Sequence, residues 1–284
     1  MGGNIGHLIS FLNKERHLDI TCYNRDFLTR CLNERLSTTK TKDYCEYIAY
    51  LQENHNEITS LINGLSISVS KFFRDPVTFD VISEKILPYL IYEKIKEENK
   101  FLRIWSAGCA SGEEPYSIAI ILNELLGEEI KDWNISIFAT DIDEISIEKA
   151  KEGIYSGECL ENIRYGLVKK YFTKEDPNYR INNEIKDMVN YSVYDLTDRN
   201  SYVPPECIFA GFDLVLCRNV LIYFEESYQK VIITKLYHSL SKPGFLVLGK
   251  YERLYDLGCF NQYSNLCKIY EKWNSVRKYV SMKQ

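Results

Sequence analysis

Two adjacent carboxylates, Glu113 and Glu114, stand in a turn of the kind that usually binds a nucleotide. They belong to the stretch SAGCASGEEPYS, residues 106–117, which lies between two apolar runs. Gly108 and Gly112 permit a tight turn with close backbone approach to a ligand, and a helix is expected to begin just after it. Because these acids would repel a phosphate, the turn favours a ligand with positive charge. The alternative is that they only complement the helix dipole.

The spacing of Ser111 and Glu114 predicts a capping box at the start of this helix, in which each side chain bonds the other residue's backbone N–H. Pro115 suits the first helical turn. The glycine pattern is neither G-x-G-x-x-G nor that of a P-loop, so the turn alone does not specify its ligand.

Asp141 follows the apolar run Ile135–Thr140 in the stretch ATDID. An acidic residue at the end of the second strand of such a unit accepts hydrogen bonds from both ribose hydroxyls. Together with Glu113 and Glu114, it describes a site for a cationic adenosine ligand that lacks phosphate. S-adenosylmethionine fits this description, because it carries a ribose, an ammonium and a sulfonium group.

Two further stretches carry residues that could do chemistry. In FDLVLCRNVLIYF, Arg218 and Asn219 follow the apolar run, and they are expected to line the crevice at the carboxyl ends of the strands. Tyr223 comes next, although ordinary packing is a strong alternative in a chain with 22 tyrosines. In SKFFRD, Arg74 lies between two phenylalanines and an aspartate, where a simple surface charge is the alternative.

Short apolar runs alternate with helical patterns from residue 101 onward, which predicts a parallel sheet covered by helices on both faces. The expected strands are 101–105, 135–140, 188–193, 212–217 and 245–249. Helices are expected over 114–126, 144–152 and 225–241, and a last run, 265–272, fits an added antiparallel strand. The chain before about residue 75 shows helical spacing of apolar residues within 27–36, 44–51 and 57–65.

The composition excludes several function classes. A net charge of −5 over 284 residues gives no reason to expect nucleic-acid binding, and no apolar run reaches the length of a membrane span. The start of the chain lacks the pattern of a signal peptide. The nine cysteines include no C-x-x-C pair and the four histidines are scattered, so we expect reduced thiols, no metal site and a cytoplasmic protein.

A local excess of positive charge lies in the first part of the chain. From Lys14 to Lys42 there are seven Lys and Arg residues against four Asp and Glu residues. A solvated helix face and a docking surface for an acidic partner explain this excess equally well.

Taken in order, the four stretches resemble the chemotaxis receptor methyltransferase (CheR) family, which carries T-x-F-F-R-D, S-A-x-x-x-x-G-E-E-P-Y-S, A-T-D-I-D and C-R-N-V-x-I-Y-F. The likeness runs from about Tyr23 to Tyr270. It implies an α/β, Rossmann-like methyltransferase domain over 76–284 that binds S-adenosylmethionine. It also implies a small all-helical domain and linker over 1–75, and a small antiparallel β subdomain inserted at about 165–190.

The resemblance further implies transfer of a methyl group to glutamate side chains of chemoreceptors, which forms glutamyl methyl esters in chemotactic adaptation. Arg74 and Tyr223 are implied to lie near the reacting methyl group. The cofactor is expected to contact residues of all four stretches and of one further segment. These are Ser68, Ser70, Arg74, Gly108, Glu113 or Glu114, Asp141, Asp195, Leu196, Arg218 and Asn219. We expect a monomer that is recruited to receptor arrays at the inner face of the membrane.

Three departures from the family pattern affect these expectations. Ser70 stands where the family usually has Thr, and it keeps the hydroxyl. Ser68 and Asp195 stand where family members have Asn, which puts those two contacts in doubt. The stretch GKYE, residues 249–252, replaces G-H-S-E, so no role falls to a histidine there.

Three other functions remain to be weighed against this one. A non-catalytic module that binds S-adenosylmethionine or tethers to receptors would keep the same fold. A methyltransferase for another carboxylate substrate would keep the same site. A nicotinamide dehydrogenase is disfavoured by the acidic turn and by the missing G-x-G-x-x-G pattern.

Overall fold

The computed structural model describes residues 5–16, 20–65, 70–198, 201–204, 207, 211–254, 258 and 260–272. The chain divides into two compact units, and the first comprises Met1–Ile67 with Leu221–Lys230. The second comprises Ser68–Val220 with Val231–Gln284. Arg74 therefore belongs to the second unit, whereas Tyr223 belongs to the first.

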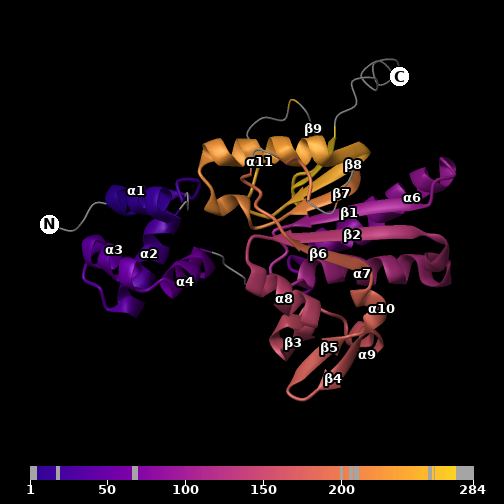
Figure 1. Ribbon diagram of the computed structural model, residues 1–284. Helices are drawn as coiled ribbons and strands as arrows, with labels where there is room; N and C mark the ends of the chain where they lie inside the picture. Colours follow the sequence, from indigo (N-terminus) through magenta and orange to yellow (C-terminus); the bar gives the residue numbers. More distant parts are fainter. Residues whose placement is uncertain are drawn as a thin grey trace. The chain divides into compact units, whose positions relative to one another are not determined.

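A seven-stranded sheet forms the centre of the second unit, with the strand order β6-β2-β1-β7-β8-β10-β9 (Figure 1). Neighbouring strands from β6 to β8 pair in parallel, whereas β10 pairs antiparallel with both β8 and β9. The strands are β1 (Phe101–Ala107), β2 (Asn134–Asp141), β6 (Val189–Val193), β7 (Phe212–Cys217), β8 (Leu240–Leu248), β9 (Phe260–Ser264) and β10 (Ile269–Lys272). Strand order reverses between β1 and β7, and open sheets of this kind bind ligands at the carboxyl ends of such strands.

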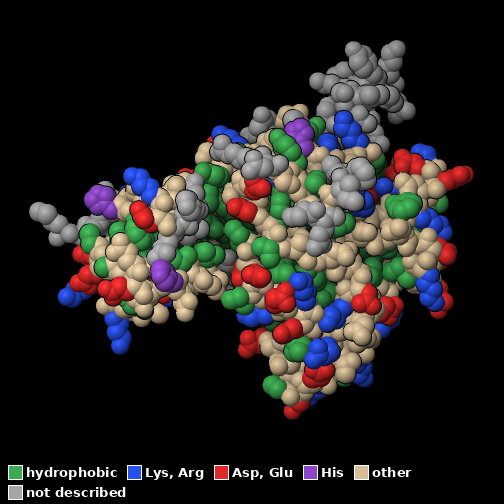
Figure 2. Space-filling view, in the orientation of Figure 1, with side chains coloured by type: hydrophobic (Ala, Val, Ile, Leu, Met, Phe, Trp, Pro, Cys, Tyr) green, Lys and Arg blue, Asp and Glu red, His purple; other side chains and the backbone are tan. Residues whose placement is uncertain are grey.

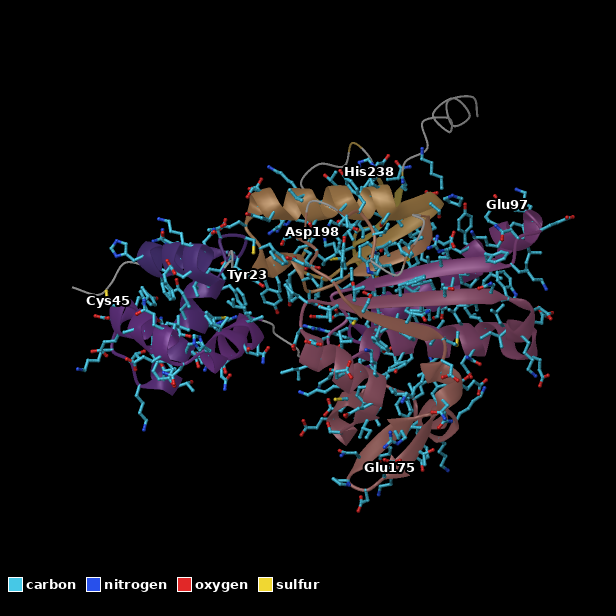
Figure 3. All side chains as sticks on the ribbon, in the orientation of Figure 1. Tyr23, Cys45, Glu97, Glu175, Asp198 and His238 are labelled. Atoms are coloured by element: carbon cyan, nitrogen blue, oxygen red, sulfur yellow. The ribbon has the colours of Figure 1, made fainter. Side chains whose placement is uncertain are left out.

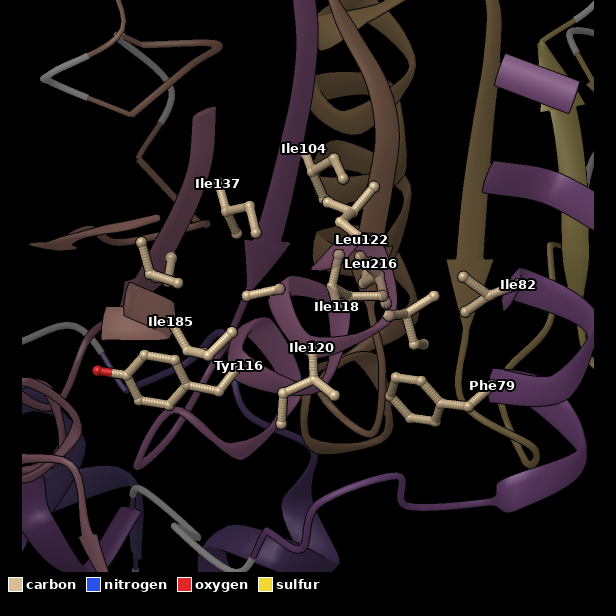
Figure 4. Packing of buried hydrophobic residues seen from close by; sticks show 14 of the residues in the cluster. Phe79, Ile82, Ile104, Tyr116, Ile118, Ile120, Leu122, Ile137, Ile185 and Leu216 are labelled. Carbon is tan, nitrogen blue, oxygen red and sulfur yellow. The ribbon is translucent and has the colours of Figure 1, made fainter. Parts of the chain in front are cut away.

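Helices cover this sheet, and Figure 1 shows α7 and α11 on its opposite sides. Ile118 and Leu122 of α7 belong to one buried cluster with Ile104 of β1, Ile137 of β2 and Leu216 of β7 (Figure 4). The helical elements around the sheet are α5 (Pro76–Val81), the π-helical turn η1 (Ile82–Ile86), α6 (Leu87–Lys96), α7 (Glu113–Leu126), the 3₁₀ turn η2 (Gly127–Asp132), α8 (Glu144–Glu152) and α11 (Glu226–Ser239).

A small antiparallel sheet with the order β3-β5-β4 lies between α8 and β6 in the chain. It contains β3 (Ile154–Tyr155), β4 (Phe172–Glu175) and β5 (Asn178–Ile181), with the turn η3 (Gly157–Leu160), α9 (Tyr165–Tyr171) and α10 (Asn183–Lys186). The predicted antiparallel subdomain is thus confirmed. Its sheet starts earlier in the chain than the predicted range, because Ile154 pairs with Arg180.

Four helices make up the described part of the first unit together with residues 221–230: α1 (Ile5–Arg16), α2 (Arg25–Thr39), α3 (Tyr44–Glu53) and α4 (Asn56–Leu65). Their apolar faces form one buried cluster. Inside it the Arg35 guanidinium donates to both carboxylate oxygens of Glu57, at 2.9 and 2.8 Å, and the Tyr47 hydroxyl donates to Glu57 Oε1 at 2.7 Å. Arg35 therefore has a structural role, and its guanidinium, which is bonded to Glu57, does not contribute to a basic docking surface.

Most predicted elements appear with shifted ends, and two predictions were wrong in detail. The helix predicted over 225–241 ends at Ser239, because Leu240 pairs with Phe212 and begins β8. The last run forms a strand only over Ile269–Lys272, and it is antiparallel as predicted. β9 was not predicted, because its side chains are mostly polar and only Phe260 is buried. Within the described ranges, every helix is too short or too polar to cross a membrane.

Candidate active site

The glycine turn packs tightly against the carboxyl ends of the neighbouring strands β2 and β7. Gly108 adopts φ +80°, and the backbone N–H groups of Gly108 and Cys109 both donate to Thr140 O, at 2.7 and 2.9 Å. A Cβ on Gly108 would lie 2.4 Å from Cγ2 of Val220, which follows Asn219. Only glycine fits there, because both the backbone angle and the close contact exclude a side chain.

The predicted capping box is wrong. The N-cap of α7 is Gly112 at φ +92°, and it makes no side-chain cap within the described residues. The Ser111 hydroxyl instead lies 2.9 Å from each carboxylate oxygen of Glu113. Glu114 accepts a hydrogen bond from the Ser106 hydroxyl at 2.8 Å. Both acids therefore serve purposes other than the helix cap.

Glu113 is buried at the centre of this turn, with 2% of its surface exposed. Burial raises the pKa of the Glu113 carboxyl, and its backbone N–H and the hydroxyls of Ser111 and Ser70 oppose this rise. The structure thus brings Ser70 of the SKFFRD segment within hydrogen-bond distance of the acid of the turn. A cation beside Glu113 would favour its charged form.

Glu114 faces a different partner. Its Oε2 lies 3.2 Å from Nη1 of Arg218, and the other side of that guanidinium reaches the SKFFRD segment. Arg218 Nη2 donates to Asp75 Oδ2 and to Arg74 O, both at 2.7 Å. The Arg218 side chain is 2% exposed, so these contacts are screened little by solvent. One buried guanidinium therefore joins three of the four motifs.

The segment that carries Arg74 has an unusual backbone. Phe73 and Asp75 both adopt the left-handed region, at φ 51° and 60°, which is uncommon for residues other than glycine. The Phe73 N–H donates to the Ser117 hydroxyl at 3.0 Å, and the buried Phe72 ring packs edge-on against Tyr155. Such strain persists only where the surroundings enforce it, and it concentrates at functional sites.

Asp141 joins the fourth motif to the turn. Its Oδ2 accepts from the Ala110 N–H at 2.8 Å, and its Oδ1 accepts from the Asp143 N–H at 3.0 Å. Burial raises the pKa of the Asp141 carboxyl, and these two backbone N–H groups oppose the rise. A carboxylate offers about four acceptor sites, so acceptor capacity remains for the hydroxyls of a ribose.

Asn219 lies at the end of β7 with φ +60°. Its Oδ1 is buried and has no hydrogen-bond partner among the described residues. A buried acceptor without a donor costs free energy, so this atom is explained best by a ligand donor such as an ammonium group. The backbone of Asn219 is held by Glu252, a residue that the sequence analysis did not single out.

The remaining predicted residues are less closely connected to this network. The Asp195 carboxylate accepts from the N–H and the hydroxyl of Thr197, both at 2.7 Å, and Leu196 is buried. The chain reaches them from the end of β6, and the Tyr194 N–H donates to Asp141 O at the end of the neighbouring β2, at 2.9 Å. Ser68 lies outside the described residues.

Tyr223 is held by the helical unit. Its ring centroid lies 4.8 Å from that of Phe27 in α2, and its carbonyl accepts from the Asn24 N–H at 2.8 Å. The next residue, Phe224, stacks on Tyr23, which is labelled in Figure 3. Arg74 and Tyr223, the two predicted catalytic residues, are therefore supported by different units.

Comparison with known protein families identifies both units. The model described as "CheR methyltransferase, SAM binding domain" matches residues 68–266, and "CheR methyltransferase, all-alpha domain" matches residues 4–66. The chain belongs to the CheR methyltransferase family. It is accordingly an enzyme with a Rossmann-like methyltransferase domain, and S-adenosylmethionine is its cofactor.

Curated members of the CheR family agree with this assignment. The chain is 34% identical over 226 residues to "Chemotaxis protein methyltransferase" of Borreliella burgdorferi, which covers 78% of each chain. It is 30% identical over 233 residues to "Chemotaxis protein methyltransferase 2" of Vibrio cholerae, covering 81% of this chain and 78% of that protein. It is 31% identical over 241 residues to the Salmonella typhimurium protein of the same kind, covering 83% and 78%.

The described residues fit the cofactor of the CheR family by their chemistry. The buried carboxylate of Glu113, the half-buried carboxylate of Asp141 and the unpaired acceptor of Asn219 suit a ligand with two positive charges and a ribose. The acids of the turn disfavour a diphosphate. Glu114 differs from Glu113, because its carboxylate is already bonded to Ser106 and Arg218.

Proposed function

We propose that the protein transfers the methyl group of S-adenosylmethionine to glutamate side chains of chemoreceptors and forms glutamyl methyl esters. The single observation that carries this proposal is the Arg218 guanidinium, which joins the acidic turn to the segment of Arg74. The alternatives, a non-catalytic module or an enzyme for another carboxylate, are not favoured, because several relatives named chemotaxis protein methyltransferase match about four fifths of the chain.

In the proposed site each cofactor group has a matching residue. Asp141 accepts hydrogen bonds from the ribose hydroxyls, and Asn219 Oδ1 accepts one from the ammonium group. Glu113, rather than Glu114, faces the cofactor as the second acid, with Ser70 beside it. Arg218 and Gly108 then act mainly through the backbone geometry that they maintain, since the Arg218 guanidinium is engaged by Glu114 and Asp75. Asp195, Leu196 and Ser68 complete the adenosine contacts that the family resemblance implies.

The reaction needs orientation rather than proton transfer. Bound S-adenosylmethionine supplies a methyl group on a positively charged sulfur, and the glutamate is already ionised at neutral pH, with a pKa of about 4.3. A carboxylate oxygen forms the new bond to the methyl carbon while the bond from sulfur to that carbon breaks. No proton moves, and the charges of sulfonium and carboxylate cancel. Arg74 holds the substrate carboxylate or the cofactor in line, and Tyr223 positions the nucleophile through its hydroxyl.

The test is methyl transfer from methyl-labelled S-adenosylmethionine to the cytoplasmic fragment of a chemoreceptor from the same organism. The expected result is label that mild base releases as methanol, because a glutamyl methyl ester is base-labile and an N-methyl group is stable. A receptor fragment with its acceptor glutamates changed to alanine is the control, and it should incorporate little label. Label that resists base, or equal label on the control fragment, would contradict the proposed substrate.

Activity on the receptor is expected to fall severalfold as ionic strength rises from about 0.05 to 0.5 M, because salt screens long-range attraction between exposed charges. We propose that the helical unit meets an acidic receptor region through its exposed cations, such as Lys14, Arg25, Arg30 and Lys40. On the face that Figure 2 shows, basic and acidic side chains are interspersed over this unit. The measurement is kcat/KM against salt.

A pair of variants tests the location of this effect. Lys40→Glu reverses one exposed charge of the helical unit, and Lys131→Glu makes the same change on the exposed turn η2 of the other unit. We expect Lys40→Glu to raise KM for the receptor and to flatten the salt response, while Lys131→Glu leaves both unchanged. If neither variant altered the salt response, the cations of the helical unit would be ordinary solvated side chains with no part in receptor binding.

The proposed place of action is the cytoplasm, at receptor arrays beside the inner face of the membrane, with the protein as a monomer. The place of action follows from the proposed substrate, whose methylated glutamates lie on its cytoplasmic helices.

A further inference from the structure

Glu252 lies behind Asn219 and is buried, with 4% of its surface exposed. Its Oε2 accepts from the Gly249 N–H at 2.6 Å and from the Asn219 N–H at 2.9 Å. Its Oε1 accepts from the Val220 N–H at 2.7 Å. One carboxylate thus receives three backbone hydrogen bonds from the segments that follow two neighbouring parallel strands. Bonds to a charged acceptor are among the stronger hydrogen bonds in proteins.

This carboxylate holds a backbone conformation that would otherwise be unfavourable. β7 and β8 run in parallel to their last residues, since Cys217 pairs with Leu248. Beyond that pair, Asn219 turns into the left-handed region at φ 60°. Such a turn leaves its N–H and that of Val220 without a strand partner, and Glu252 accepts both. The direction in which the Asn219 side chain leaves the backbone therefore depends on Glu252.

Gly249 completes the arrangement. A Cβ on Gly249 would lie 2.7 Å from Asn219 N, 2.7 Å from Glu252 Oε2 and 3.1 Å from Asn219 Nδ2. The amide nitrogen of Asn219 thus packs against this glycine, while its Oδ1 is buried without a partner among the described residues. The residues Gly249 and Glu252 set the position of an amide group whose acceptor atom is still unused.

We infer that Glu252 is a positioning residue for cofactor binding, which orients the Asn219 amide so that its Oδ1 accepts from the ammonium group of S-adenosylmethionine. The inference rests on the proposed function, because it assumes that Asn219 binds the cofactor. Glu252 touches neither the cofactor nor the substrate in this arrangement. It acts on the cofactor through the backbone of Asn219 and Val220.

The experiment is a double-mutant cycle read by calorimetric binding of S-adenosylhomocysteine, the demethylated product that keeps the ammonium group. Glu252→Gln replaces one acceptor oxygen by an NH₂ group that faces backbone N–H donors. We expect it to raise the Kd about tenfold, the effect of one buried hydrogen bond to a charged group. Asn219→Ala should raise the Kd similarly, and the double variant should bind about as weakly as the weaker single variant. Such coupling is the sign that Glu252 acts through Asn219.

Three measurements keep the result interpretable. Glu184→Gln makes the same chemical change at an exposed position of the same unit and should bind as the unaltered protein does. Thermal unfolding shows whether each variant is folded. If Glu252→Gln does not fold, Gly249→Ala replaces it, because the added Cβ displaces the contact between Glu252 and Asn219 from the side of Gly249. Gly249→Ala should show the same loss and the same dependence on Asn219.

Two results would overturn the inference about Glu252 without affecting the proposed function. One is an unchanged Kd in Glu252→Gln, and the other is losses that simply add in the double variant, which would make Glu252 a general stabiliser. An unchanged Kd in Asn219→Ala would instead remove Asn219 from the cofactor site, and with it both the proposed contact and this inference. Methyl transfer to the receptor would still test the proposed reaction separately.

Discussion

Replacing Arg74 with alanine is expected to lower kcat for methyl transfer to a receptor fragment about a hundredfold or more, because the reacting groups lose their alignment. The protein should stay folded. The segment is held through backbone atoms, with the Phe73 N–H bonded to the Ser117 hydroxyl and Arg218 bonded to Arg74 O. Alanine keeps both bonds, so the loss reports on the guanidinium alone.

The same variant distinguishes the two roles proposed for Arg74. If the guanidinium holds the substrate glutamate, Arg74→Ala should bind S-adenosylhomocysteine normally; if it orients the cofactor, this affinity should fall as well. Arg164→Ala is the matched control, because Arg164 is an exposed arginine of the same unit. Full activity in Arg74→Ala would remove Arg74 from the catalytic set.

Replacing Tyr223 with phenylalanine is expected to lower kcat about tenfold or more, the effect of losing one hydrogen bond to a charged group. The change deletes only the hydroxyl. The ring remains, and with it the contact with Phe27 and the backbone bond from Asn24. Affinity for S-adenosylhomocysteine should be unchanged, since the proposed cofactor contacts lie elsewhere. Single-turnover methyl transfer at saturating receptor is the measurement.

Tyr50→Phe serves as the control for this change, because Tyr50 is a half-buried tyrosine of the same helical unit. It should leave kcat unaltered. A second variant, Phe27→Leu, loosens the support of the Tyr223 ring without touching its hydroxyl. If Tyr223→Phe retained full activity, the hydroxyl would have no role, and Tyr223 would be a packing residue of the helical unit.

Local patterns in the sequence predicted the strands and helices that position the site. Runs of apolar residues predicted β1, β2, β6 and β7 to within two residues at each end. The prediction is best for β7, which is buried at every residue, because a strand buried on both faces needs little besides hydrophobic side chains. Two failures have different causes. Leu240 is a strand residue because it pairs with the distant Phe212. The capping box is absent because the side chains of Ser111 and Glu114 bond to Glu113 and Ser106 instead.

The sequence by itself determined the family, the cofactor class and the order of the four motifs along the chain. These follow from residue types at short spacings, which any fold of this chain must keep. It could not show that Glu114 is bonded to Arg218, 104 residues away, or that Glu252 holds Asn219, 33 residues away. Such contacts depend on which strand ends the sheet order brings together, and that order is a property of the whole chain.

Tertiary structure also separated two acids that look equivalent in the sequence. Glu113 and Glu114 are adjacent, yet one is held by the hydroxyls of the turn and the other lies in a buried ion pair. Successive helix residues point about 100° apart, so the two side chains reach different surroundings. In the same way, Tyr223 follows Asn219 by four residues but is supported by the helical unit. Only the packing of segments far apart in the chain could decide these roles.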